Sequence, residues 1–355
     1  MTFDEAVYQQ EESVKNIKPD IDRIFAVGRN ILRENADYCY SGTSSKDRYI
    51  DYGFHLKATT FLDKGWNLYD TDTLANSDHK GDKVKGQPRI LYVEPNSPSH
   101  GKLRIGDEIL SVNNILLDKE TYLKNLKLFK DEVYEKAPNV LNMSISRNGR
   151  KIQVSVMGEV TCPFRLLALI NHGIKQDGDI NAYADGQNII ITTSISRFAD
   201  KDSELALVIG HELAHNMMAH IDKGRTNSAL GSIADLGIAV LTGVHSNTFQ
   251  AIGANAYSQS FEQEADYIGI YLAANAGYKM DKAPDFWRRF ATKYPEAIHL
   301  VGSSHPSTAQ RHVALSMAVK EINRKKAQGL PLHPDDAPEM SIDRPTDASD
   351  ATYND

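Results

Sequence analysis

The segment SELALVIGHELAHNMMAHI, residues 203–221, decides the fold of this chain. Apolar residues recur on nearly every face of it, which predicts a helix that is buried on all sides. Because His211 and His215 are four residues apart, they lie about 40° apart around such a helix and can bind one metal ion. Glu212 lies beside them, where a carboxylate can take a proton from a metal-bound water. The segment therefore predicts a buried helix that carries a zinc site and its general base.

A third metal ligand is expected from a later helix, because a catalytic zinc ion takes three protein ligands and keeps one open position. Residues 260–276 are predicted to form this helix, which ends before Gly277. Glu262 and Asp266 share one face of it. Glu262 is the predicted ligand, and Asp266 is the predicted carboxylate that accepts the second ring proton of a ligand histidine. Glu264 lies about 200° away and is expected to be a solvated surface acid.

The two motifs HExxH and ExxxD resemble peptidase family M48, and so do the stretches NAYADGQNIIITTSI, FEQEADYIGIYLAANAGY and HPSTAQR. The resemblance covers residues 159–320. It implies a mainly helical, zincin-like (gluzincin) metalloprotease domain with a small edge β-sheet. It also implies one zinc ion per chain, bound by His211, His215 and Glu262, with Glu212 as the general base. Integral-membrane members of the family carry spanning helices around this core, and their absence here argues against a prenyl-protein substrate.

Three further residues near these motifs are considered for roles at the site. By the resemblance, His305 lies near the metal, where it donates to the oxyanion of the reaction or covers the metal at rest; the alternative is a loop histidine that caps the next helix. Arg311 is expected to pair with the site or with Asp266, unless it is a surface arginine. His220 lies five residues after His215, about 140° around the helix, and is expected on the surface.

Residues 188–193, which read as a strand, are expected to bind substrate. In zincins an edge strand beside the metal helix pairs with the extended substrate. This predicts that the main chain of Asn188, Ile189, Ile190 and Ile191 binds the substrate by strand pairing, which tolerates many side-chain sequences. The alternative is an internal strand.

The N-terminal half is expected to contain a helix and a strand-rich unit. Residues 4–35 predict a helix that Pro19 begins or breaks, and residues 49–62 predict a strand. Further along the chain we expect a loop at 70–88, a helix at 119–133, and strands at 108–112, 140–146 and 151–156. The last two strands are joined by Asn148-Gly149, a strong hairpin signal.

The stretches PNSP and GDEILSVNN make residues 86–158 look like a PDZ domain. In that reading, residues 52–56 form its carboxylate-binding loop and first strand, and the unit binds an extended peptide at a sheet edge. The alternative is a unit that only packs.

These patterns predict an α+β chain of four parts. The parts are an N-terminal helical segment (1–48), a PDZ-like β-rich domain (49–158), the metallopeptidase domain (159–328) and an acidic, Pro-rich, disordered tail (329–355). In the third part, residues 165–176 are predicted to be helical.

Composition limits the partners. Hydrophobic residues make up 41% and charged residues 25%, the mix of a globular protein. The 40 basic and 47 acidic residues give a net charge of −7, of which residues 331–355 hold seven acids and one arginine, or −6. The remaining −1 offers no basic field, which argues against nucleic acid as a partner. No apolar run reaches the length of about 18 residues that predicts a spanning helix.

Location is left open between two compartments. The first residues, MTFDEAVYQQEESVK, lack the regions of a signal peptide, so the chain is expected in the cytoplasm or as a mature or trimmed form. A PDZ module before an M48 domain resembles a bacterial envelope architecture, which favours the periplasm. Cys39 and Cys162 form either a disulfide, which needs an oxidising compartment, or two buried thiols.

The sequence thus predicts a zinc-dependent endopeptidase that cleaves extended or misfolded proteins, with the PDZ-like unit recruiting or gating substrate. The alternative is a peptide-binding, chaperone-like quality-control factor whose metal site is idle or autoinhibited.

Overall fold

The computed structural model describes residues 2–40, 48–55, 88–90, 92–117, 128–129, 132–133, 136–170, 180–221, 259–294 and 309–335. Residues 70–87 of the predicted loop at 70–88, most of the predicted helix at 119–133, His305 and the tail from residue 336 lie outside these ranges. The described residues mix helices and strands and form two separate hydrophobic cores. Among them, no helix is both long and apolar enough to cross a membrane.

The larger core is built around a three-stranded sheet with the order β10-β11-β9. Strand β11 (Asn188–Thr192) is antiparallel to β10 (Ala182–Ala184) and parallel to β9 (Arg165–Leu169). The prediction of a helix at 165–176 is therefore wrong at its start. The run RLLAL is too short for its apolar spacing to separate a strand from a buried helix, and the pairing with β11 selects the strand.

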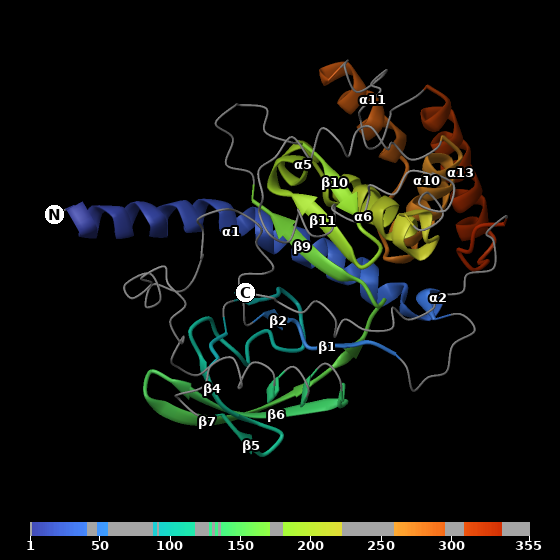
Figure 1. Cartoon of the computed structure of the whole chain (residues 1–355). Coiled ribbons are helices and arrows are strands. Elements are labelled where there is room, and N and C mark those ends of the chain that lie inside the picture. Colours follow the sequence, from blue (N-terminus) through green and yellow to red (C-terminus); the bar gives the residue numbers. More distant parts are fainter. Residues whose placement is uncertain are drawn as a thin grey trace, which may run out of the picture.

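The other helices of the larger core lie above and to the right of this sheet in Figure 1. They are α5 (Thr193–Phe198), α6 (Asp202–Met217), α10 (Gln259–Asn275), α11 (Ala283–Lys293) and α13 (Ala309–Ala327). Helix α6 is buried along its length, as its apolar residues predict, and packs against α10. Helices α11 and α13 then cover the outer side of this pair (Figure 1).

The long helix α1 (Thr2–Glu34) runs between the two cores, and its first turns extend beyond the rest of the molecule (Figure 1). It contacts α5, α6 and β9. The prediction that Pro19 begins or breaks a helix is wrong, because α1 continues through it. Ile17, Ile21 and Ile24 are buried on both sides of the proline. We attribute the intact helix to this packing, which opposes a cost of about 3 kcal/mol for an interior proline.

The smaller core belongs to the strand-rich unit. Its main sheet has the order β5-β4-β6-β7, from strands β4 (Glu108–Val112), β5 (Ile115–Leu116), β6 (Val140–Arg147) and β7 (Arg150–Met157). Short pairs join β2 (Phe54–His55) to β3 (Tyr92–Val93) and β1 (Ile50–Asp51) to β8 (Glu159–Val160). The predicted hairpin is present, and Asn148 and Gly149 adopt φ values of 51° and 76°.

The strand predicted at 49–62 lies outside the described residues from position 56 on, and its described part is split into β1 and β2 by Gly53, whose φ is 69°. The N–H of Gly53 donates to Asp51, and its carbonyl accepts from the N–H of Glu94 and from the hydroxyl of Ser97. This N–H is therefore already used and is not offered to a peptide carboxylate. The resemblance to a PDZ domain stays a prediction.

Two features fasten α1 and the following short helix α2 (Ala36–Cys39) to the rest of the chain. Cys39 and Cys162 form a disulfide with a Cα–Cα distance of 5.5 Å, which selects the first of the two predicted alternatives. The buried guanidinium of Arg29 pairs with three carboxylates of the strand-rich unit, those of Asp51, Glu94 and Glu159.

Residues 330–335, which the sequence placed in the disordered tail, contact the helices in the structure. The ring of His333 stacks on Tyr38, and Asp335 pairs with Lys325 of α13. These contacts hold residues 330–335 against the helices.

Candidate metal centre

Three side chains from two helices converge in the larger core. His211 and His215 of α6 and Glu262 of α10 are each at most 1% exposed, and one ligand atom from each lies within 4.8 Å of the others. The Nε2 atoms of the two histidines are 3.1 Å apart, and they lie 3.5 Å and 3.4 Å from the carboxylate oxygens of Glu262. Three ligands about 2.1 Å from a tetrahedral zinc ion would be about 3.4 Å apart. The donor set and its spacing therefore fit zinc.

A close crossing of α6 and α10 sets this spacing. Gly210 and Gly269 face each other, so that a Cβ on Gly210 would lie 2.4 Å from the carbonyl oxygen of Gly269. A Cβ on Gly269 would lie 2.6 Å from the backbone nitrogen of His211. Only glycine allows two backbones to approach this closely. The pair thus lets Glu262 reach the histidines across the helix interface.

Asp266 and Arg311 hold the carboxylate and one histidine in place. Asp266 Oδ1 lies 3.0 Å from His211 Nδ1, the ring nitrogen that faces away from the three-ligand cluster. Arg311 of α13 donates to both oxygens of Asp266, at 2.6 Å and 2.8 Å, and its Nη1 lies 2.8 Å from Glu262. Arg311 is 2% exposed, so it is not the surface arginine of the alternative prediction.

The charges around His211 favour its protonated form. Burial alone would lower the pKa of His211, but the hydrogen bonds and charges of Asp266 and Glu262 outweigh it and raise the pKa to about 9. Burial likewise tends to raise the pKa of Asp266, yet the charge of Arg311 and its hydrogen bonds hold it below its usual range. A metal ion must therefore displace a proton from His211.

Helix α11 closes the cluster from a further side, and the sequence patterns did not predict it. The ring of Trp287 lies 5.9 Å from that of His211, and the guanidinium of Arg311 lies 5.0 Å from the centre of the Trp287 ring. Arg289 binds both carboxylate oxygens of Glu204, in the first turn of α6, at 2.8 Å. Trp287 lies in a short helix that has no metal-binding motif, so a single sequence does not indicate that it lies beside the metal site.

The prediction of a surface position for His220 is wrong. Helix α6 ends at Met217, and Ala219 adopts a φ of 50°, so the chain turns back and does not carry His220 further around the helix. His220 is fully buried, with its Nδ1 2.9 Å from Nδ1 of His215. Its Nε2 lies 2.8 Å from Glu264, which is therefore not a free, solvated acid.

The prediction that residues 188–191 form an edge strand is also wrong. Strand β11 is the central strand of its sheet, and its backbone already pairs with β10 and β9. Asn188, Ile189, Ile190 and Ile191 are all buried. The run of isoleucines fits a strand covered on both faces, which is the internal alternative.

Asn216 of α6, which the patterns did not single out, ties this sheet to the metal-site helix. Its Nδ2 donates to the carbonyl of Asn188 at 3.0 Å, and its Oδ1 accepts from the N–H of Gly186 at 2.8 Å. Because Asn216 directly follows His215, these bonds fix the β10–β11 turn relative to the cluster. His305 lies outside the described residues, so its predicted role stays a prediction.

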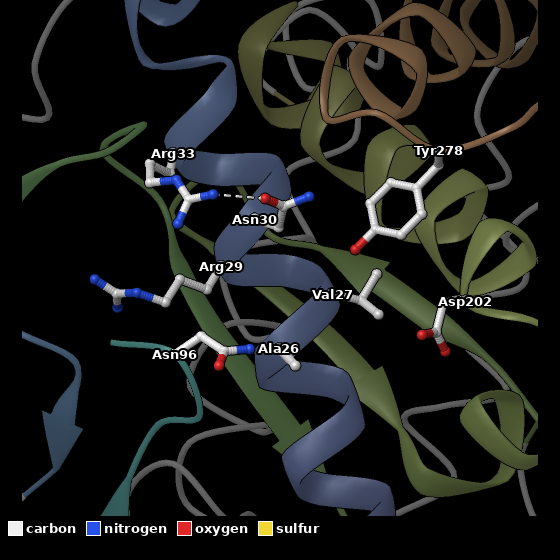
Figure 2. Close-up of a pocket in the computed structure, with 8 residues that line it drawn as sticks. All are labelled: Ala26, Val27, Arg29, Asn30, Arg33, Asn96, Asp202 and Tyr278. Carbon is white, nitrogen blue, oxygen red and sulfur yellow. Dashed lines mark hydrogen bonds between the residues drawn. The ribbon is translucent and has the colours of Figure 1, made fainter. Parts of the chain in front are cut away.

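A separate crevice of about 380 Å³ lies along α1, away from the cluster (Figure 2). Figure 2 shows Arg29, Asn30 and Arg33 on one side of it and Tyr278 and Asp202 on the other. Arg29 is engaged by the three carboxylates of the strand-rich unit, and Asp202 pairs with Arg23. None of the residues that line the crevice belongs to the histidine cluster.

Comparison with known proteins agrees with the geometry of the cluster. Residues 170–319 match the model of the family described as Peptidase family M48. The chain is 28% identical over 216 residues to the beta-barrel assembly-enhancing protease of Escherichia coli (strain K12), which covers 53% of this chain and 41% of that protein. It is 27% identical over 240 residues to the protein of the same name from Yersinia pestis, covering 61% of this chain and 46% of that one.

A eukaryotic protein is similar over a shorter range. The mitochondrial metalloendopeptidase OMA1 of Arabidopsis thaliana is 32% identical over 143 residues, which are 39% of this chain and 29% of that protein. The chain therefore spans less than half the length of each of these relatives.

Proposed function

We propose that this chain is a zinc-dependent endopeptidase that hydrolyses extended or misfolded proteins, because residues 170–319 match the model of peptidase family M48. The observation that carries the proposal is the convergence of His211, His215 and Glu262 beside Glu212 in a buried site. Two imidazoles and one carboxylate, with a fourth position open, are the ligand set of a catalytic zinc ion. We assign one ion per chain.

The bound ion would supply a Lewis acid that polarises the scissile carbonyl and acidifies water. Glu212 follows His211 on α6 and is 2% exposed, so its carboxylate acts in a poorly solvated site. In the proposed reaction Glu212 takes the proton of the attacking water and delivers it to the leaving amine. Asp266 and Arg311 orient His211 and Glu262, and His305 retains its proposed role at the oxyanion or as a cover.

We place the protein in the cell envelope, in protein quality control. The disulfide between Cys39 and Cys162 supports an oxidising compartment. Both bacterial relatives described above are named beta-barrel assembly-enhancing proteases, which supports a substrate among envelope proteins. In this proposal the PDZ-like unit recruits or gates the substrate.

Hydrolysis of casein by the wild-type chain and by Glu212→Gln, with zinc supplied, tests the proposal. The expected result is cleavage by the wild-type chain, inhibition by a chelator and a loss of about 10²–10⁴-fold in Glu212→Gln. Equal activity in both would refute the role of Glu212. A wild-type chain that binds zinc and unfolded protein but cleaves nothing would favour the chaperone-like alternative.

A further inference from the structure

His215 has a partner on the side away from the three-ligand cluster, and that partner is another histidine. Nδ1 of His215 lies 2.9 Å from Nδ1 of His220, and Nε2 of His220 lies 2.8 Å from Oε2 of Glu264. Both imidazoles are fully buried, whereas the side chain of Glu264 is 28% exposed. The three groups form a continuous chain from the cluster toward the surface.

Only one arrangement of protons is consistent with this chain when His215 binds a metal. A ligand nitrogen must be unprotonated, and Nε2 of His215 faces Glu262 and His211. The neutral ring of His215 then carries its proton on Nδ1 and donates it to Nδ1 of His220. His220 must therefore carry its own proton on Nε2, and it donates this proton to the carboxylate of Glu264.

The contacts around His220 hold its ring in this orientation. The ring of Phe261 stacks on it at a centroid distance of 4.4 Å and an angle of 9°. The turn at Ala219 brings His220 back toward His215. Stacking on one face and hydrogen bonds at both nitrogens leave the ring no freedom to rotate.

Helix α10 then supplies an outer carboxylate for each of the two ligand histidines. Asp266 approaches His211 directly, and Glu264 reaches His215 through His220. The outer hydrogen bond of a ligand histidine fixes its ring and tautomer and raises its basicity, and its loss typically costs about 10–100-fold in metal affinity.

We propose that His220 and Glu264 are positioning residues that orient His215 for zinc through this hydrogen-bonded chain. The inference rests on the proposed function, because it requires that His215 be a zinc ligand. It assigns a task to Glu264 and His220, neither of which contributes to the three-ligand cluster itself.

Four variants test the proposal. His220→Phe keeps an aromatic ring against Phe261 but removes both nitrogens, whereas His220→Gln keeps an acceptor and a donor. Glu264→Ala removes the outer acceptor at a partly exposed position, where misfolding is not expected. His100→Phe, at an exposed histidine of the strand-rich unit, is the matched control.

The measurements are the zinc dissociation constant by chelator competition, the visible spectrum of the Co²⁺-loaded protein, and kcat and KM on casein. We expect His220→Phe and Glu264→Ala to weaken zinc binding by about 10–100-fold. The Co²⁺ spectrum should shift and kcat should fall more than KM changes. His220→Gln should recover most of the affinity, and His100→Phe should match the wild-type chain.

Zinc affinity within twofold of wild type in both His220→Phe and Glu264→Ala would overturn the inference. It would also be overturned if His220→Gln behaved no better than His220→Phe, because the effect would then come from packing alone. A wild-type chain that binds no zinc would refute the proposed function itself, and this inference with it.

Discussion

Replacement of Gly269 by alanine should weaken the metal site through the backbone. The added Cβ would lie 2.6 Å, 2.7 Å and 2.8 Å from backbone atoms of His211 and Gly210. Such contacts are ordinarily about 3.5 Å, so α6 and α10 must separate by about 1 Å. No side-chain rotation can relieve this clash. Glu262, two turns earlier on α10, would then be displaced from His211.

Two opposing effects set the size of the change. Overpacking costs about 1–3 kcal/mol, and alanine regains about 1 kcal/mol of helix propensity, so the free energy of unfolding falls by about 2 kcal/mol at most. Ligand positions must be held to about 0.5 Å, so a shift of about 1 Å should cost zinc affinity about tenfold or more. Zinc affinity is therefore the more sensitive quantity.

Zinc titration against a competing chelator measures this directly, with Gly28→Ala as the control. The three atoms nearest to a Cβ on Gly28 all belong to the side chain of Leu166, the nearest at 2.3 Å, and that side chain can rotate. Gly28→Ala should therefore bind zinc as the wild-type chain does. Wild-type zinc affinity in Gly269→Ala would refute the view that the glycine crossing sets the ligand spacing.

Three further predictions concern stability. Ala219→Gly should raise the free energy of unfolding by about 1 kcal/mol in urea titrations, because the φ of 50° at residue 219 disfavours alanine; a loss of stability would contradict this. The double variant Cys39→Ser/Cys162→Ser should lose about 2–5 kcal/mol, measured in the same way, and an unchanged midpoint would argue against the disulfide. Burial tends to raise the pKa of Glu204, but the hydrogen bond and charge of Arg289 hold it below the usual value. The stability that this pair provides is present above the ordinary carboxyl pKa and is lost as the pH falls through the lowered pKa of Glu204. Arg289→Met should therefore reduce the fall in melting temperature on the acid side of a plot of melting temperature against pH. An unchanged fall would exclude the pair as its source.

Short sequence motifs predicted those features of the molecule that depend only on the geometry of a single helix or turn. The spacing of His211 and His215 on one helix, and of Glu262 and Asp266 on another, is fixed by the helical repeat. The hairpin at Asn148-Gly149 follows from backbone preference in the same way. Each of these features is complete within a few neighbouring residues, so one sequence is enough to predict it.

The predictions that were wrong depend on contacts between distant segments. Strand β9 was mistaken for a helix because its pairing with β11 decides between the two, and that pairing also places β11 in the centre of the sheet. The surface position of His220 was inferred by extending a helix that ends at Met217. The sequence did not predict the turn at Ala219, because alanine rarely adopts a positive φ. Trp287 reaches the site only through the packing of α11.

Anomalous X-ray diffraction at the zinc edge, from crystals grown with zinc, tests the central claim most directly. We expect a single strong peak about 2.0–2.2 Å from Nε2 of His211, Nε2 of His215 and a carboxylate oxygen of Glu262. The peak should disappear in a His211→Ala/His215→Ala double variant. A peak bound elsewhere, or none at this cluster in crystals of the wild-type chain, would contradict the assignment of the metal centre.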